Sequence, residues 1–371
     1  MSARVVTFSN RDAEQFVNEL KTKVTEFFQS TGKSQKANAG MVIKTIVLVS
    51  ALVVPWTILM TVALPKLVML GIAVVMGLVI AGIGFAVSHD ALHGAYSHNP
   101  KINAAIGLTF DMMGANGYLW RIMHNVVHHT YTNIPGIDED LDATWALRLS
   151  PHAPYRKVHR FQHWYALFPY SLATLNWVFV KDIRYFFRKE IGPYDQKQHP
   201  VREWLLLFGG KAFYVTWSIV LPLLLLDLAW WQFLIGYLAM HFTTAVVMSV
   251  IFQLAHVVEQ TEHPVPGPGR VMEHQWMVHE LVTTANFAMH NRLLSWYVGG
   301  LNFQIEHHLF PKICSVHYPA ISRIVRETAE KYGIPYNYHG TLFGAVRSHW
   351  AMLRKLGQPP VDGTGSLAAA A

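Results

Sequence analysis

Residues 45–88 read TIVLVSALVVPWTILMTVALPKLVMLGIAVVMGLVIAGIGFAVS, and Lys66 is the only charged residue among them. A helix needs about 20 apolar residues to cross the hydrocarbon core of a bilayer, and this stretch supplies that length twice. Pro65 and Lys66 separate residues 45–64 from residues 67–88. The stretch therefore predicts a tight hairpin of two membrane-spanning helices.

A second pair of apolar segments occurs later in the chain. Residues 204–226, interrupted by Lys211, and residues 228–255 flank Asp227. The whole chain is 52% hydrophobic and 14% charged, whereas soluble domains carry about 25% charged residues. We therefore expect an all-α integral membrane protein with four transmembrane helices in two hairpins, together with interfacial helices and a cytosolic helical cap.

Residues 161–180 are also free of acidic and basic side chains and could be counted as a fifth span. The segments on both sides of it are basic, and the positive-inside rule places both of them in the cytosol. Seven of its twenty residues are aromatic, which favours a helix at the level of the lipid headgroups. We predict an interfacial helix here, flanked by Arg156, Lys157, Arg160, Lys181, Arg184, Arg188 and Lys189.

The same rule orients the rest of the chain, because the two short outer turns contain only Lys66 and Asp227. Most of the net charge of +7 then lies in the cytosol. Residues 1–40 lie there too, since they lack the apolar core of a signal peptide. Residues 41–356 would form the membrane domain, and residues 357–371 a disordered tail or a cloning remnant.

Histidines cluster at the end of the second apolar segment and again soon after it. As a helix this segment would be about 33 Å long, which brings the following HDALH motif just beyond the hydrocarbon core. The spacing of four residues places His89 and His93 on one helical face. In the next motif, HNVVHH, His124 and His128 repeat this spacing, while His129 points about 100° away.

A third motif, QIEHH, ends in His307 and His308. The last apolar segment would be about 42 Å long as a continuous helix, well over the core thickness, so His256 at its end should also reach the cytosolic layer. All eight histidines then lie on one face of the membrane, provided that residues 161–180 do not cross it. Cys314 is the single cysteine, so histidine and carboxylate are the available metal ligands.

The remaining histidines have ordinary structural interpretations. His159 and His163 share the four-residue spacing but have no companions. His241 lies within an apolar helix, where an ionisable group is a functional candidate, although one packing histidine is the favoured interpretation. We interpret the others as surface or supporting residues: His98, His152, His199, His263, His274, His279, His290, His317, His339 and His349.

The motifs HDALH, HNVVHH and NFQIEHHLFP, in this order, resemble those of the membrane fatty acid desaturases. The resemblance covers about residues 45–338, including both hairpins, the DEDLD run after the second motif and the HYPAISRIV stretch after the third. It implies a diiron site held in the cytosolic cap, dioxygen as co-substrate and the removal of two hydrogens from an acyl chain. The ligands that it implies are His89, His93, His124, His128, His129, His307 and His308, with His256 as an additional ligand.

Gln304 stands where many family members have the first histidine of the third motif. This replacement resembles the front-end group, which inserts a double bond between an existing one and the carboxyl end, although some bacterial members of other regiochemistry share it. We regard Gln304 as a metal ligand or a neighbour of the ligands.

Acidic residues near the three motifs are candidates to orient the imidazoles. Neutral imidazoles leave a metal pair more positive than carboxylates would, so nearby acids that accept hydrogen bonds from imidazole N–H groups are useful. An acidic run that is merely solvated is the alternative interpretation. The candidates are Asp90, Asp138, Glu139, Asp140, Asp142, Glu259 and Glu306.

The resemblance also implies partners. Residues 1–44 contain no histidine, and so no HPGG haem motif of the kind fused to many eukaryotic front-end desaturases. We therefore expect a separate electron donor, a ferredoxin or cytochrome b5 with its reductase, which a basic cytosolic face would attract. The substrate would be the acyl chain of a lipid or acyl-CoA, with no nucleic acid involved. The membrane would be the bacterial inner membrane or the endoplasmic reticulum, with the active site on the cytosolic face.

Two other classes stay open at this point. A histidine-rich hydroxylase, ketolase or alkane monooxygenase would share the architecture, and product analysis separates it because hydroxylation adds oxygen. A metal transporter or membrane haem protein would place its ligands within the membrane, whereas His241 is the only histidine of this chain that we expect deep within the membrane.

Overall fold

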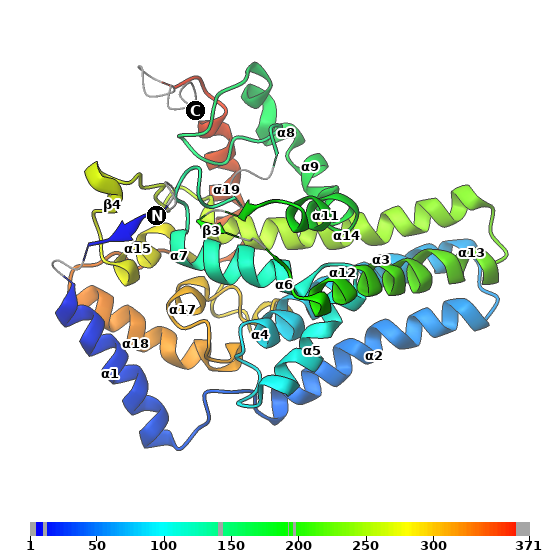
Figure 1. Cartoon of the computed structure of the whole chain (residues 1–371), viewed down its shortest axis with the longest axis horizontal. Helices are drawn as coiled ribbons and strands as arrows, with labels where there is room; N and C mark the ends of the chain where they lie inside the picture. Colours follow the sequence, from blue (N-terminus) through cyan, green and yellow to red (C-terminus); the bar gives the residue numbers. More distant parts are fainter. Residues whose placement is uncertain (1–4, 10–12, 140–143, 192, 196–197, 361–371) are drawn as a thin grey trace.

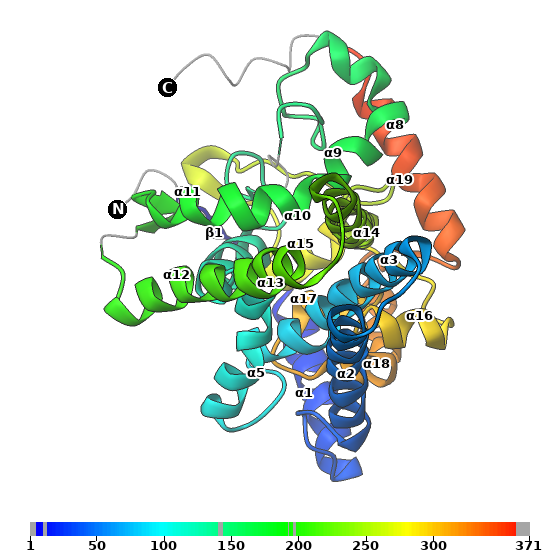
Figure 2. The ribbon, with the colours of Figure 1, turned by 90° about the vertical axis from the view of Figure 1, so that its right-hand side faces the viewer.

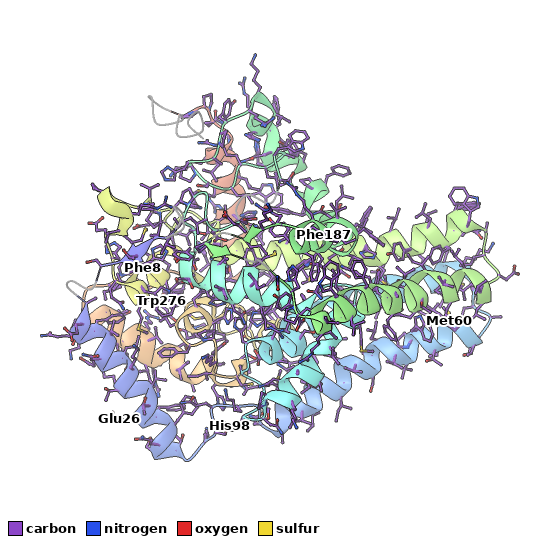
Figure 3. All side chains as sticks on the ribbon, viewed as in Figure 1. Phe8, Glu26, Met60, His98, Phe187 and Trp276 are labelled. Atoms are coloured by element: carbon purple, nitrogen blue, oxygen red, sulfur yellow. The ribbon has the colours of Figure 1, made fainter. Side chains whose placement is uncertain are left out.

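The molecule is built almost entirely from helices, as the computed structural model shows for residues 5–9, 13–139, 144–191, 193–195 and 198–360. Long helices lie side by side at one end, while shorter helices and loops form a cap at the other (Figure 1). Met60 lies near the far tip of the long helices, and Phe8 and Trp276 lie in the cap (Figure 3). This arrangement confirms the predicted all-α architecture.

Four helices among the described residues are long and apolar enough to cross a membrane: Ala39–Thr61, Lys66–Leu92, Val201–Leu225 and Trp230–His256. They confirm the two predicted hairpins. The first helix begins earlier than predicted because the Asn38 side chain caps it, accepting the Met41 N–H at 3.0 Å. Its one charged side chain, Lys44, is buried in the protein rather than exposed to lipid.

Two of the spans are uninterrupted helices, α2 (Ala39–Thr61) and α14 (Trp230–His256). Each of the other two contains a turn of π-helix, a distortion that recurs at functional sites. The interrupted spans consist of α3 (Lys66–Ile83), η1 (Gly84–Ser88) and α4 (His89–Leu92), and of α12 (Val201–Val215), η5 (Thr216–Val220) and α13 (Leu221–Leu225).

The helices α3 and α14 pack closely against each other (Figure 2). A Cβ atom at Gly77 would lie 2.5 Å from the Met240 carbonyl oxygen, so a larger residue would push the helices apart. The Thr244 hydroxyl donates a hydrogen bond to the Gly77 carbonyl at 2.9 Å. This packing fixes the positions of His89 and His256, which stand where the two spans meet the cap.

Residues 161–180 form no span, as predicted, but the single interfacial helix expected there is broken into short pieces. Pro169 lacks a backbone N–H and so cannot continue a regular ladder of helical hydrogen bonds. The pieces α9 and α10 pack along α14. The segment contains η3 (Lys157–Phe161), α8 (Gln162–Tyr165), α9 (Leu167–Ser171), α10 (Ala173–Asn176), η4 (Trp177–Lys181) and α11 (Asp182–Phe186).

The cap has its own hydrophobic core. Its largest cluster joins α1 to α18 and includes Phe16, Leu20, Ile321 and Val325. The predicted N-terminal segment thus contributes a helix to the cap rather than lying apart from it. The helix α5 (Pro100–Met112) packs against η1, α4 and α12 of the spans. The cap helices are α1 (Glu14–Thr31), α6 (Gly117–Trp120), η2 (Arg121–His128), α7 (His129–Tyr131), η6 (Pro268–Arg270), α15 (Trp276–Thr283), α16 (Arg292–Tyr297), α17 (Gln304–Leu309), η7 (Ser315–His317), α18 (Tyr318–Lys331) and α19 (Leu342–Leu356).

Two short strand pairs, β1–β4 and β5–β6, tie distant segments of the cap together, and a third joins neighbouring residues. Among the described residues there are three pairs of two-residue strands. The pairs are β1 (Thr7–Phe8) with β4 (Val271–Met272), parallel; β2 (Glu190–Ile191) with β3 (Tyr194–Asp195), antiparallel; and β5 (Asn286–Phe287) with β6 (Tyr338–His339), parallel.

Most of the predicted C-terminal tail, residues 361–371, lies outside the described part of the chain.

Candidate metal centre

The eight histidines predicted as ligands come together at the junction of the spans and the cap. Each of them is at most 8% exposed to solvent. They come from four segments that are distant in the sequence. His89 and His93 begin and follow α4, His124 and His128 lie on η2, His129 begins α7, His256 ends α14, and His307 and His308 lie on α17.

The third motif reaches the first because of two glycines in the loop before it. Gly299 and Gly300 both adopt positive φ angles, which favour glycine. A Cβ atom at Gly299 would lie 2.5 Å from the Cα atom of Ala86 in η1. The loop therefore packs directly on the π turn before His89, and the His89 and His307 ring centroids lie 4.5 Å apart.

The second motif lies on a π-helix rather than on a regular α-helix. A π-helix pairs residues five apart, so His124 and His129 meet, with their Nε2 atoms 3.2 Å apart. The spacing rule had placed His124 and His128 on one face. Their rings do stack, with centroids 5.1 Å apart, but their ligand atoms belong to different groups.

The ligand atoms form adjoining groups, in each of which the atoms lie within 4.8 Å of one another. Two residues of the third group also belong to the other groups, so the sites are neighbours. The groups are His89, His93, His124 and His307; His128, His256 and His308; and His129, His307 and His308.

Several ring nitrogens in this cluster lack a hydrogen-bond partner in the described protein. They are Nε2 of His93, His307 and His308 and both ring nitrogens of His256. Buried polar atoms almost always have a hydrogen-bond partner. Nitrogens that lack one fit a metal site, because each can donate its lone pair to a metal ion. Burial also lowers the pKa of His93 and His307 well below its usual range, which keeps these imidazoles in the neutral form that binds metals.

Three side chains orient imidazoles from behind. Asp138, one of the candidate acids from the sequence, has its Oδ2 3.0 Å from His128 Nδ1. Sequence reasoning missed the other two: Glu280, whose Oε2 lies 2.7 Å from His308 Nδ1, and Tyr318, whose hydroxyl lies 3.2 Å from His307 Nδ1.

The two missed residues carry no spacing signal in the sequence. Glu280 is on α15, far along the chain from every motif, and only tertiary packing brings it to His308. It is fully buried, and burial raises the pKa of Glu280 well above its usual range. Tyr318 follows the third motif within HYPAISRIV, a stretch that marked the resemblance without indicating a role for the tyrosine.

Comparison with known proteins agrees with this geometry. The sequence model of the family described as fatty acid desaturase matches residues 65–340. An sn-1 linoleoyl-lipid 6-desaturase of Arthrospira platensis is 35% identical over 351 residues, which cover 93% of this chain and 93% of that protein. The protein of the same name from Synechocystis sp. (strain ATCC 27184 / PCC 6803 / Kazusa) is 35% identical over 343 residues, 91% of this chain and 94% of its own length. An acyl-lipid (8-3)-desaturase of Physcomitrium patens is 31% identical over 352 residues, 94% of this chain and 73% of that protein.

The chain belongs to the fatty acid desaturase family. This desaturase is a membrane oxidoreductase that uses dioxygen to desaturate fatty acyl chains. Its relatives support the front-end type that Gln304 favours.

In this desaturase the Asp90 side chain stabilises the fold rather than orienting an imidazole. Its Oδ2 accepts hydrogen bonds from the Ser315 N–H at 3.1 Å and the Ser315 hydroxyl at 2.8 Å. Its Oδ1 lies 3.9 Å from His89 Nδ1, beyond hydrogen-bond distance. Asp90 thus ties α4 to the segment after the third motif.

The other acids also depart from the prediction that they orient imidazoles. Glu306 accepts hydrogen bonds from Asn286 and Tyr336 at 2.8 Å each, which joins α17 to the strand pair β5–β6. Glu259 is exposed, because the chain reaches the surface there after the buried residues Val257 and Val258.

Glu139 accepts a hydrogen bond from Tyr185 and forms an ion pair with Arg188 at 2.7 Å. These contacts hold it at the edge of the site rather than against a histidine. The predictions for Asp140 and Asp142 lie outside the described residues.

A cavity of about 760 Å³ opens beside the histidines. His89, His124, His307 and Gln304 line it, so Gln304 lies where an acyl chain would meet the metal site. The Trp120 ring stacks on His124, with centroids 4.4 Å apart. The rest of the wall is mostly aromatic and aliphatic, and the basic residues in it are Lys181, Arg184 and Arg188.

The histidines interpreted as structural lie outside the metal cluster. His241 Nδ1 pairs with the Thr174 hydroxyl at 2.9 Å, and His241 Nε2 pairs with the Tyr214 hydroxyl. His159 accepts the Arg156 N–H and contacts the Trp145 carbonyl, each at 3.0 Å. Both agree with the packing interpretation.

Proposed function

We propose that the eight histidines bind two iron ions at the adjoining groups. The convergence of eight buried imidazoles, several with unpartnered nitrogens, is the observation that carries this proposal. When bound, such an iron pair supplies the dioxygen-dependent oxidation that removes hydrogen from an unactivated methylene. Gln304, which lines the cavity together with His307, would face the substrate beside the iron ligands.

The side chains behind the imidazoles have a defined role in this proposal. A carboxylate that accepts a hydrogen bond from Nδ1–H leaves the Nε2 lone pair of the same ring for the metal. Glu280 does this for His308, and Asp138 for His128. The Asn133 N–H donates to Asp138 Oδ2 at 3.0 Å and holds that carboxylate in place.

We propose an acyl chain on a lipid as the substrate, with the new double bond at carbon 6. Two relatives that match more than 90% of this chain are named as 6-desaturases of lipid-bound linoleoyl chains, which supports both choices. The cavity supports the orientation of the chain. Its basic residues lie on η4, on α11 and just after α11, suited to a headgroup at the membrane interface, and its apolar walls suit the hydrocarbon.

The active site would face the cytosol, and the electrons would come from a separate ferredoxin or cytochrome b5. Short outer turns and a basic inner surface support this orientation. Acidic carriers are attracted to basic surfaces at low salt, and the attraction weakens as salt rises. Turnover should therefore require an added donor with its reductase, and its rate should fall with ionic strength.

Expression in a host with a compatible reductase tests the proposed function. Mass spectrometry of the membrane lipids should locate a new double bond at carbon 6 of chains that already carry one further along. Hydroxylated chains without new double bonds would contradict the reaction type. New double bonds on the methyl side of existing ones would contradict the regiochemistry.

A further inference from the structure

Not all of the eight histidines line the cavity. His129 and His308 are absent from its wall. Their rings stack on each other, with centroids 4.3 Å apart, and both belong to one group of ligand atoms. Helix α15 contacts this pair, because Glu280 on that helix pairs with His308. The cavity and α15 therefore reach the cluster through different histidines.

Trp276, the first residue of α15, connects this pair of histidines to the surface of the cap. Its indole N–H donates a hydrogen bond to the His129 carbonyl oxygen at 3.1 Å. Glu280 lies one turn further along the same helix, so α15 contacts both stacked histidines. The Trp276 side chain is half-buried, and the rest of it is exposed to solvent.

In the described part of the chain, Trp276 is the one side chain that both forms a hydrogen bond with one of the eight histidines and reaches solvent. The other side chains with such a bond are buried, so a protein that docks on the cap cannot touch them. They are Thr132, Asn133, Asp138, Thr261, Glu280 and Tyr318. A partner protein can therefore approach the ligands most closely at Trp276.

The contact of Trp276 with His129 suits the passage of an electron. Electrons tunnel faster through covalent and hydrogen bonds than across a gap, and here one hydrogen bond and the bonds of His129 join the indole to an imidazole. Phe8, a second half-buried aromatic residue of the cap (Figure 3), packs on His279 of α15, with ring centroids 5.1 Å apart. Aromatic side chains are enriched where proteins bind one another.

We propose that the electron donor, a protein that carries one electron at a time, docks over Trp276 and delivers its electrons through the contact of this residue with His129. This inference rests on the proposed function. Each encounter oxidises one donor by one electron. Two electrons and two protons, with the two hydrogens removed from the acyl chain, reduce one dioxygen to two water molecules. Trp276 does not line the cavity, so the donor can dock while the acyl chain is bound.

Two substitutions of Trp276 in the full-length chain test this proposal. Trp276→Phe keeps an aromatic ring but removes the indole N–H, and Trp276→Leu removes both. Trp217→Phe is the matched control, because the Trp217 indole N–H also donates to a carbonyl, that of Met112 at 2.8 Å, but from a membrane span.

Three measurements are made on each variant. The oxidised, iron-loaded protein is mixed without oxygen with reduced ferredoxin or reduced cytochrome b5, and the absorbance of the donor gives its rate of oxidation. Dithionite with a small mediator dye replaces the donor in a parallel reaction, which needs no docking. Binding of the oxidised donor is measured on the metal-free protein in lipid nanodiscs.

We expect Trp276→Leu to slow oxidation of the donor and to weaken its binding, each by about tenfold. Trp276→Phe should slow oxidation by a smaller factor with binding unchanged, and Trp217→Phe should alter neither. The iron content and the dithionite reaction should be the same in all three.

An unchanged rate of donor oxidation in Trp276→Leu would overturn the proposal. An equal loss in the dithionite reaction would also overturn it, because Trp276 would then only support the fold of the site. If the unaltered protein oxidises neither donor and forms no double bonds, the failure lies in the proposed function instead.

Discussion

Two histidines on the same helix, His241 and His256, show how a packing histidine differs from a ligand. Both are buried and lie fifteen residues apart on α14. Both ring nitrogens of His241 have hydroxyl partners, whereas neither nitrogen of His256 has a hydrogen-bond partner among the described residues. Burial alone therefore does not mark a metal ligand. What distinguishes His256 is that its unpartnered nitrogens accompany a ligand atom within 4.8 Å of those of His128 and His308.

Replacement of His256 should have the largest effect. His256→Ala removes a ligand from the group that also contains His128 and His308, so desaturation should be abolished and the iron content should fall, while the protein remains folded. Iron per chain and product formation are measured on the same detergent-purified sample. Normal iron together with normal activity would remove His256 from the site.

Replacement of Glu280 should have the next largest effect. Glu280→Gln replaces the buried carboxyl group whose Oε2 lies 2.7 Å from His308 Nδ1, and loss of such partners costs about 10- to 100-fold in metal affinity or activity. The matched control is Glu259→Gln, since Glu259 is exposed. Competition with a chelator measures iron affinity in both variants, and equal affinities would refute the role of Glu280.

Replacement of His241 should change stability and leave the metal in place. His241→Leu leaves the hydroxyls of Thr174 and Tyr214 without their partner in the membrane, which costs about 1–3 kcal/mol. Denaturant titration in detergent gives the free energy of unfolding, and metal analysis gives the iron content. A loss of iron from the folded variant would show that the contrast with His256 is false.

Removal of the Tyr318 hydroxyl should have the smallest effect. Tyr318→Phe keeps the ring but deletes the hydrogen bond to His307, which is worth about 0.5–1.5 kcal/mol. Iron affinity should fall by a few fold. Tyr165→Phe, whose hydroxyl contacts the Ala146 carbonyl far from the site, should leave the affinity unchanged, and an equal loss in both would argue against Tyr318.

The sequence predicts features that recur along the chain and misses those that tertiary packing creates. Apolar length was sufficient to find four spans, and motif spacing, helix length and the family resemblance together indicated the eight histidines that come together. Spacing assumed regular α-helices, so it could not show that the π-helix η2 divides His124 and His128 between groups. Nothing in the sequence around Glu280 indicates that it contacts a histidine. Glu259 and Glu306 lie near the histidine motifs in the sequence, but their side chains do not contact an imidazole of the site.

The broken segment α8–α11 shows the same limit. Its composition indicated correctly that it does not span the membrane, but not that it supplies Thr174 to His241 and Trp177 to the cavity wall. Those contacts depend on how the segment packs against α14, which no periodicity in residues 161–180 reveals. Sequence reasoning therefore indicated the clustered histidines more completely than the residues that line the cavity.

The iron content of the unaltered protein tests the central claim most directly. The chain is purified anaerobically in detergent, and its metals are quantified against protein mass together with the desaturation activity of the same sample. The account predicts about two iron ions per chain, because eight imidazoles exceed the needs of one ion. Active protein that contains one metal ion per chain, or stoichiometric zinc without iron, would contradict it.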